Sequence, residues 1–176
     1  MTGFYAADAF AVDTKTSGTL TGLRWGSASD TPVLALHGWL DNASSFAPLA
    51  AHLSGFQLLA LDLPGHGHSQ HRPPGMRYHL LDYVPAVLEA AEGLGWESGL
   101  IMGHSLGGAI AGLVAIAARE RVRAMILIEG LGPLSEPETK LPGRLRNSVE
   151  GYARAQTRSS PVYPDIEPLI ATRARI

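Results

Sequence analysis

A pentapeptide beyond the middle of the chain has the pattern expected of a catalytic serine. Gly103-His104-Ser105-Leu106-Gly107 matches G-x-S-x-G and lies between a predicted strand and a predicted helix. In that setting the serine sits on a strained turn, and the glycines on either side remove Cβ atoms that would clash. The turn exposes the hydroxyl and points the N–H of Leu106 at the same spot. The pattern therefore predicts Ser105 as a nucleophile; the alternative is a glycine-rich turn with an incidental serine.

A second tripeptide suits the stabilisation of an oxyanion. His37-Gly38-Trp39 directly follows an apolar run, and Gly38 lets the chain turn so that the N–H of Trp39 becomes a second donor beside Leu106. Two fixed donors matter because acyl transfer concentrates charge on one oxygen, and losing one donor typically costs about 3–4 kcal/mol. We expect His37 and Gly38 to support this loop, as Gly103, His104 and Gly107 support the turn at Ser105.

The elements that must position these residues follow from hydrophobic patterning. Short, almost wholly apolar runs are typical of strands buried on both faces of a parallel sheet. They follow two strands joined by a turn at Ser17-Gly18. The six predicted strands are Ala9–Thr14, Leu20–Trp25, Val33–His37, Gln57–Leu63, Leu100–Met102 and Met125–Ile128.

Helical patterns alternate with the strands. One helix is predicted from a cap at Asp41, Asn42 or Ser44 to about Leu53. The next ends near Gly93 and begins near Asp82, because Pro85 is tolerated only in a first turn. The third spans residues 106–118. This alternation predicts an α/β fold. Past Gly130 a linker precedes two basic amphipathic segments, residues 143–156 and 165–175.

Composition excludes several classes of protein. The chain has 176 residues, 45% of them apolar, a net charge of −2 and no cysteine. This fits a globular protein and excludes disorder, a disulfide framework and a cysteine-ligated metal. No apolar run is long enough to span a membrane and no secretory signal begins the chain, so we expect a cytoplasmic protein without a membrane partner.

Charge is unevenly distributed along the chain. Residues 1–139 carry 13 acids against 7 bases, whereas residues 140–176 carry 3 acids against 7 bases. Basic segments can attract nucleic acid. Here, however, the bases alternate with apolar residues, as on the wet face of amphipathic helices, and we expect no nucleic-acid partner.

With these motifs in place, the chain resembles the α/β-hydrolase superfamily, specifically its bacterial serine-hydrolase-like members. The resemblance implies the N-terminal portion of an α/β-hydrolase fold, with about six mostly parallel strands and flanking helices, over residues 1–132. It also implies the beginning of a helical cap over residues 133–176, and a small ester or thioester substrate. Serine at the turn argues against the dehalogenase and epoxide hydrolase chemistries. The matching stretches are His37–Phe46, Leu61–Ser69, Leu94–Trp96, Gly103–Gly108 and Ile128–Pro133.

One departure from the family pattern concerns the base. The superfamily orders its triad as serine, acid, histidine, yet no histidine follows Ser105 in this sequence. We expect the C-terminal core strands and the catalytic histidine to lie outside this chain, which alone would be inactive. Glu129, at the end of the sixth strand, is a candidate acid; the alternative is a carboxylate that binds loop N–H groups. A second hypothesis is a truncated or degenerate hydrolase that serves as a binding or assembly module.

Other motifs give weaker signals. His66, His68 and His71 form H-x-H-x-x-H, but they lie in a loop that the family has without a metal, so no metal site is expected. No cofactor is expected either, since the nucleotide-binding glycine patterns fail. The sixth strand, taken as Ala124–Ile128, contains no charge or proline to protect an edge. We therefore expect this strand to pair with a second copy of the chain or with a missing C-terminal segment. The other expected partner is the small acyl substrate.

Overall fold

The computed structural model describes residues 6–132, 135–156 and 165–173. By their internal contacts the residues divide into two units, Met1–Ser135 and Glu136–Ile176. The first contains every strand of the described sheet, and the second contains helices. Within the described residues, no helix is both long and apolar enough to cross a membrane.

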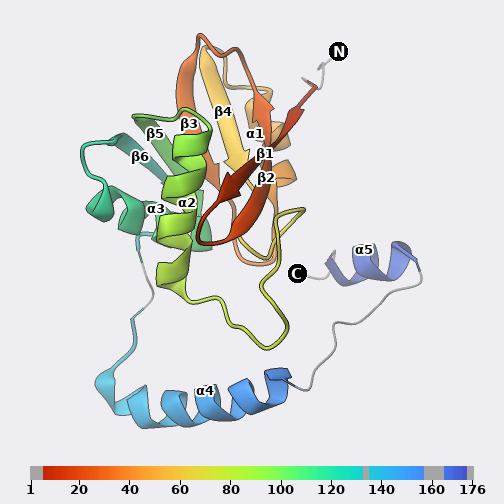
Figure 1. Ribbon diagram of the computed structural model, residues 1–176, viewed down its shortest axis with the longest axis vertical. Coiled ribbons are helices and arrows are strands. Elements are labelled where there is room, and N and C mark those ends of the chain that lie inside the picture. Colours follow the sequence, from red (N-terminus) through yellow and green to blue (C-terminus); the bar gives the residue numbers. More distant parts are fainter. Residues whose placement is uncertain (1–5, 133–134, 157–164, 174–176) are drawn as a thin grey trace. The chain divides into compact units, whose positions relative to one another are not determined.

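The first unit is built on a six-stranded sheet in the order β1-β2-β4-β3-β5-β6 (Figure 1). β1 and β2 form an antiparallel hairpin, β2 pairs antiparallel with β4, and the remaining pairs are parallel. All six predicted strands are present, with somewhat different ends. They are β1 (Asp8–Thr14), β2 (Gly18–Trp25), β3 (Thr31–Leu36), β4 (Phe56–Leu61), β5 (Gly99–His104) and β6 (Val122–Ile128).

Helices cover the two faces of this sheet unequally. α2 (Tyr83–Gly93) packs on β1 and α3 (Leu106–Ala117) packs on β3, β5 and β6, forming the larger core; α2 lies in front of the strands in Figure 1. On the other face, the short helix η1 (Ala43–Phe46) and the single turn α1 (Ala47–Ala50) close a smaller core with β2, β3 and β4. Pro85 falls in the first turn of α2, as its position in the sequence predicts.

The helix predicted from Asp41 to Leu53 is shorter than expected and begins with a 3₁₀ turn. Asn42, one of the three candidate caps, caps it, its side chain accepting the N–H of Ser44 at 2.9 Å. Pro48 has no N–H to donate to the carbonyl of Ser44, so the α-helical ladder cannot run through this turn. The predicted position of this helix is thus confirmed, whereas its predicted length is too great.

β6 forms one end of the described sheet and is poorly covered. Met125 and Leu127 lie on the face that α3 covers, because they pair with Ile101 and Gly103 of β5. Ile126 and Ile128 lie on the opposite face, where the helix contacts fall on β2, β3 and β4. Met125, Ile126 and Ile128 are 44%, 42% and 37% exposed. As the sequence predicts, an apolar strand therefore stands at the border of the sheet.

The second unit contains η3 (Glu138–Lys140), α4 (Leu141–Gln156) and α5 (Glu167–Arg173). α4 begins two residues before the predicted segment, and the last residues of the second predicted segment, 174–175, lie outside the described part. An ion pair joins Arg144 of α4 to Glu136 at 3.5 Å. α4 presents an exposed apolar stripe at helical spacing, which consists of Leu141, Leu145, Val149 and Tyr152.

Candidate active site

Ser105 occupies a strained turn between β5 and α3. Its backbone has φ 49° and ψ −110°, a conformation that costs a residue with a side chain about 1–3 kcal/mol. The turn is held on both sides. The N–H of Ser105 donates to the carbonyl of Ile128 at 2.8 Å, and its carbonyl accepts the N–H of Ala109 at 3.1 Å. The Ser105 residue itself is exposed. The structure therefore places this hydroxyl at the end of the sheet, open to a reacting group.

The glycines around Ser105 permit close backbone packing. A Cβ on Gly103 would lie 2.3 Å from the carbonyl oxygen of Gly107, and a Cβ on Gly107 would lie 2.0 Å from that of Leu36. A Cβ on Gly130, which follows β6, would lie 2.9 Å from the carbonyl oxygen of Ser105. Gly130 is a support that the sequence analysis did not single out. The sequence feature that could have indicated this role is a glycine shortly after the end of β6, the strand beside β5.

The loop after β3 lies directly against this turn. Leu36 pairs with Gly103, so β3 and β5 end side by side. Among the described residues, neither the N–H of Trp39 nor that of Leu106 has a hydrogen-bond acceptor. Leu106 is the first residue of α3, where backbone N–H groups lack partners within the helix and the helix dipole favours negative charge. Within the described part of the chain, the two amides predicted as oxyanion donors are therefore unpaired.

His37 fixes the start of that loop. The ring is buried, and its Nε2 accepts the N–H of Leu63 at 3.0 Å. The proton therefore resides on Nδ1, which donates to the carbonyl of Gly38 at 2.7 Å. Burial lowers the pKa of His37 below its usual 6.5. His37 is thus a neutral support that ties the loop after β3 to the end of β4.

His66 and Trp39 extend this support. The His66 ring meets the His37 ring edge-on at 5.1 Å and the Trp39 ring at 5.4 Å. His66 is buried, which lowers its pKa below 6.5, whereas Trp39 is 59% exposed. The indole of Trp39 therefore lies at the surface with one edge held by His66. Sequence analysis missed this contact, which joins loops that follow two different strands.

Acidification is expected to destabilise the first unit through His37 and His66. Their pKa values are lowered in the folded chain, so both stay neutral where the unfolded histidines, near 6.5, bind protons. Stability is therefore unaffected by these groups above about pH 6.5 and falls below it, by at most about 1.4 kcal/mol per histidine per pH unit.

Urea unfolding at about pH 7.5 and about pH 5.5 measures this effect. His66→Phe should reduce the difference between the two unfolding free energies, while the exposed His52→Gln should leave it unchanged. A chain that is equally stable at both values would contradict the assignment of neutral buried rings.

Asp62 organises the loop after β4. Its buried carboxylate accepts the N–H of Ala43 at 2.8 Å, the hydroxyl of Thr21 at 3.0 Å and the N–H of His68 at 3.1 Å. The hydroxyl of Ser69 donates to its backbone carbonyl at 2.6 Å. These bonds join β2, η1 and the histidine-containing loop. Within the described residues, no group of three histidine or acidic side chains is arranged to hold a metal ion.

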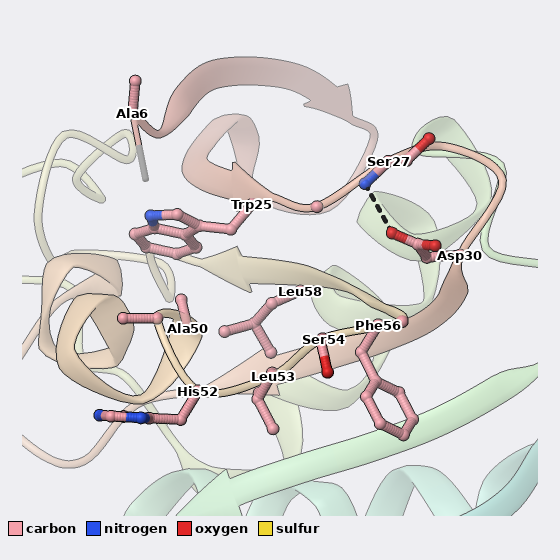
Figure 2. Close-up of a pocket in the computed structure, with 13 residues that line it drawn as sticks. Ala6, Trp25, Ser27, Asp30, Ala50, His52, Leu53, Ser54, Phe56 and Leu58 are labelled. Carbon is pink, nitrogen blue, oxygen red and sulfur yellow. Dashed lines mark hydrogen bonds between the residues drawn. The ribbon is translucent and has the colours of Figure 1, made fainter. Parts of the chain in front are cut away.

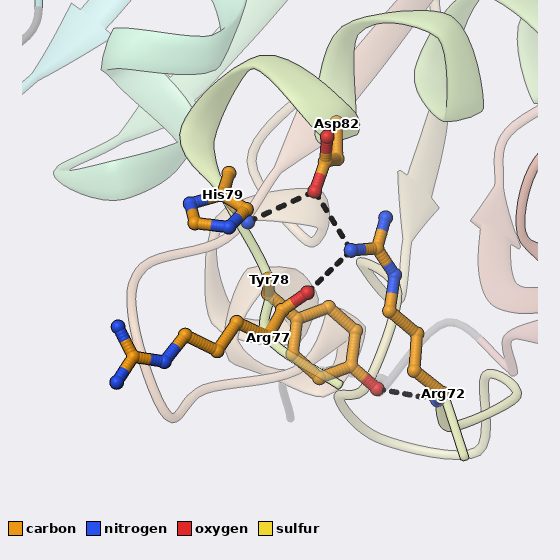
Figure 3. Close-up of polar contacts among 5 residues, drawn as sticks. All are labelled: Arg72, Arg77, Tyr78, His79 and Asp82. Atoms are coloured by element: carbon orange, nitrogen blue, oxygen red, sulfur yellow. Dashed lines mark hydrogen bonds and ion pairs between the residues drawn. The ribbon is translucent and has the colours of Figure 1, made fainter. Parts of the chain in front are cut away.

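A polar network holds the segment between that loop and α2 (Figure 3). Arg72 donates through Nη1 to the carboxylate of Asp82 at 2.7 Å and to the carbonyl of Arg77, and its backbone N–H donates to the hydroxyl of Tyr78 at 2.7 Å. The N–H of His79 also donates to Asp82 at 3.0 Å. The hydrogen bond from Arg72 holds the pKa of Asp82 below its usual value. The network ties the loop after β4 to the start of α2.

His104 and Glu129, the remaining predicted residues, lie together. Nε2 of His104 is 3.3 Å from a carboxylate oxygen of Glu129. Glu129 follows β6 directly and has a positive φ of 55°. The sequence analysis considered Glu129 as an acid for a histidine from outside the chain. The structure pairs it with a histidine of the chain itself, the residue before Ser105.

A hollow of about 680 Å³ lies at the other end of the sheet (Figure 2). Its walls come from the end of β2, the segment after α1 and the start of β4, and include Trp25, His52, Phe56 and Leu58. β3, β4 and β5 are parallel, and Ser105 follows the carboxyl end of β5, whereas Phe56 begins β4. This hollow is therefore separate from the candidate active site.

Comparisons with known proteins agree with this architecture. The sequence profile of the alpha/beta hydrolase fold family matches residues 31–165, and the chain belongs to this family. It is 38% identical over 133 residues to a serine hydrolase-like protein of Danio rerio, covering 75% of this chain and 41% of the relative.

Solved structures give the same result. A hypothetical protein of Pseudomonas aeruginosa PAO1 superposes with a TM-score of 0.86 at 39% identity, over 95% of this chain and 59% of its own. A thioesterase domain from the curacin biosynthetic pathway gives 0.77 at 26% identity, over 97% of this chain and 61% of its own. The chain thus spans between about two-fifths and three-fifths of the length of these three proteins.

Proposed function

We propose that this chain carries the nucleophile half of a serine hydrolase that cleaves small esters or thioesters through an acyl-enzyme. The observation that carries the proposal is the conformation of Ser105, which is held at φ 49° between β5 and α3 with its residue exposed. Because Ser105 is exposed, its side chain is not part of the buried core. A strained and exposed hydroxyl at the end of a buried sheet is typical of a nucleophile.

The reaction would proceed in two steps. The hydroxyl oxygen of Ser105 attacks the acyl carbonyl while a base removes its proton, and the carbonyl oxygen becomes an oxyanion bound by the N–H groups of Trp39 and Leu106. Collapse of this intermediate expels the alcohol or thiol, which takes up the proton from the base. Water then attacks the acyl-serine in the same way, releasing the acid and restoring Ser105.

The base is the component that this chain does not provide in the family's order. All seven histidines lie at or before position 104. Both ring nitrogens of His37 are already hydrogen-bonded to backbone groups. We propose that a histidine from polypeptide outside these residues acts as the base. The candidate acid is Glu129, whose carboxylate lies within hydrogen-bond distance of His104, the residue before Ser105.

A non-catalytic binding or assembly module is the second candidate. The exposed strand β6 favours it. This strand is proposed to pair with a second copy of the chain or with a C-terminal segment of a longer polypeptide. The two candidates differ in one measurable property, the reactivity of Ser105 when a base is supplied.

Added imidazole can supply that base in the chain as it is. With p-nitrophenyl butyrate as substrate, we expect hydrolysis that rises with imidazole concentration to about tenfold or more above the rate of the Ser105→Ala variant. That variant also corrects for direct hydrolysis by imidazole. Ser54→Ala is the matched control and should retain the full rate, because this exposed serine lines the hollow at the other end of the sheet. Equal rates for the unaltered chain and Ser105→Ala would reject the hydrolase in favour of the binding module.

A further inference from the structure

The imidazole of His104 occupies the space beside Gly38. A Cβ on Gly38 would lie 2.9 Å from Nδ1 and 3.2 Å from Cε1 of this ring. Gly38 directly precedes Trp39, whose N–H is the candidate oxyanion donor. The ring of the residue before Ser105 therefore packs on the backbone of the loop that carries the other half of the oxyanion site.

The opposite side of the ring faces the end of β6. Nε2 lies 3.3 Å from the carboxylate of Glu129, and an ionised carboxylate only accepts hydrogen bonds, so Nε2 carries a proton. The backbone of Glu129 is held in turn, because the next residue, Gly130, packs against the carbonyl of Ser105. The His104 ring thus contacts segments that follow two different strands, β3 and β6.

We propose that His104 is a positioning residue that sets the spacing between the Ser105 turn and the oxyanion loop, and that Glu129 is its anchor. This inference rests on the proposed function, since it names what aligns the same site. Within the described residues, the ring of His104 has no hydrogen bond to the hydroxyl of Ser105, which argues against His104 as the base.

The pair of His104 and Glu129 is too exposed to contribute much to the free energy of unfolding. The His104 side chain is 36% exposed and that of Glu129 is 79% exposed, and exposed ion pairs contribute little to stability. Loss of the pair should therefore alter local geometry without lowering the midpoint of thermal unfolding. A spectroscopic readout at the two donor amides distinguishes these effects.

The first test follows the amide resonances of Trp39 and Leu106 in ¹H–¹⁵N spectra of the chain. His104→Ala should shift or broaden both, Glu129→Gln should shift them in the same direction by less, and His104→Gln should restore positions close to those of the unaltered chain. Resonances of β3 and β4 should stay in place. His52→Ala, at an exposed histidine near the other end of the sheet, is the control. Unchanged resonances of Trp39 in His104→Ala would overturn the proposal.

The second test uses the steric contact with Gly38. Gly38→Ala should displace the His104 ring and lower the midpoint of thermal unfolding. The same substitution in a His104→Ala background should cost clearly less, because the space for the added methyl group is then available. Equal costs in the two backgrounds would show that the ring is not against Gly38 and would overturn the proposal.

These tests do not depend on turnover. If imidazole fails to restore hydrolysis but His104→Ala shifts both donor amides, the proposed function fails and the positioning contact stands. If hydrolysis depends on Ser105 but neither test detects coupling, the hydrolase stands and the role of His104 fails.

Discussion

Replacing Gly107 with alanine is expected to lower the free energy of unfolding by about 3 kcal/mol. The added Cβ would lie 2.0 Å from the carbonyl oxygen of Leu36 and 2.7 Å from that of His37, and both are backbone atoms of the central sheet and its loop. Neither can rotate away as a side chain would. α3 must therefore move off β3, which opens the larger core and displaces the turn at Ser105.

Gly112→Ala is the matched control for this prediction. Gly112 lies in the same helix, and a Cβ there would meet nothing within 4 Å. Alanine is the better helix former, so this variant should gain about 0.5–1 kcal/mol. Urea unfolding followed by circular dichroism measures both changes. Comparable effects of the two substitutions would contradict the close packing of α3 on β3.

The chain alone is expected to self-associate through β6. The carbonyl of Ile128 is directed toward β5, where it accepts the N–H of Ser105, so the alternate residues Met125 and Leu127 direct their backbone groups to the free edge. Arg123 lies at an irregularity in the pairing of β6 with β5. Antiparallel pairing of two copies about Met125 would set Arg123 of one copy opposite Leu127 of the other, which opposes no like charges. It would also cover Ile126 and Ile128 in part.

Light scattering coupled to size-exclusion chromatography measures this association. The unaltered chain should elute with a mass at least twice its 18.6 kDa, and Ile126→Lys should shift it toward the monomer. Ile116→Lys replaces another exposed isoleucine, on α3 rather than at the edge, and should leave the association unchanged. A stable, monodisperse monomer of the unaltered chain would contradict the prediction.

Local patterns in the sequence were sufficient to predict the elements of the fold. Apolar runs located β3, β4, β5 and β6, because a strand buried on both faces must be apolar throughout. The turn at Ser17-Gly18 located β1 and β2. Pro85 located the start of α2, since proline is tolerated only in the first turn. The motif around Ser105 predicted a strained turn between a strand and a helix, and the structure has that turn.

Contacts between distant residues could not be predicted in the same way. Asp62 accepts a hydrogen bond from Thr21, and His104 meets Glu129, across 41 and 25 residues. Such pairs follow from sheet order and register, which no local periodicity encodes. The length of the helix after Asn42 was overestimated for a different reason, because Pro48 interrupts a pattern that otherwise favours a helix.

The most direct test of the central claim is the intact mass of the chain after treatment with a fluorophosphonate in the presence of imidazole. The account predicts a single adduct on a chain of 18.6 kDa, located on Ser105 by peptide mapping and absent from Ser105→Ala. Without imidazole, or another source of the base, labelling should be much slower. An unmodified mass under all conditions, or an adduct that persists in Ser105→Ala, would contradict the assignment of Ser105 as the nucleophile.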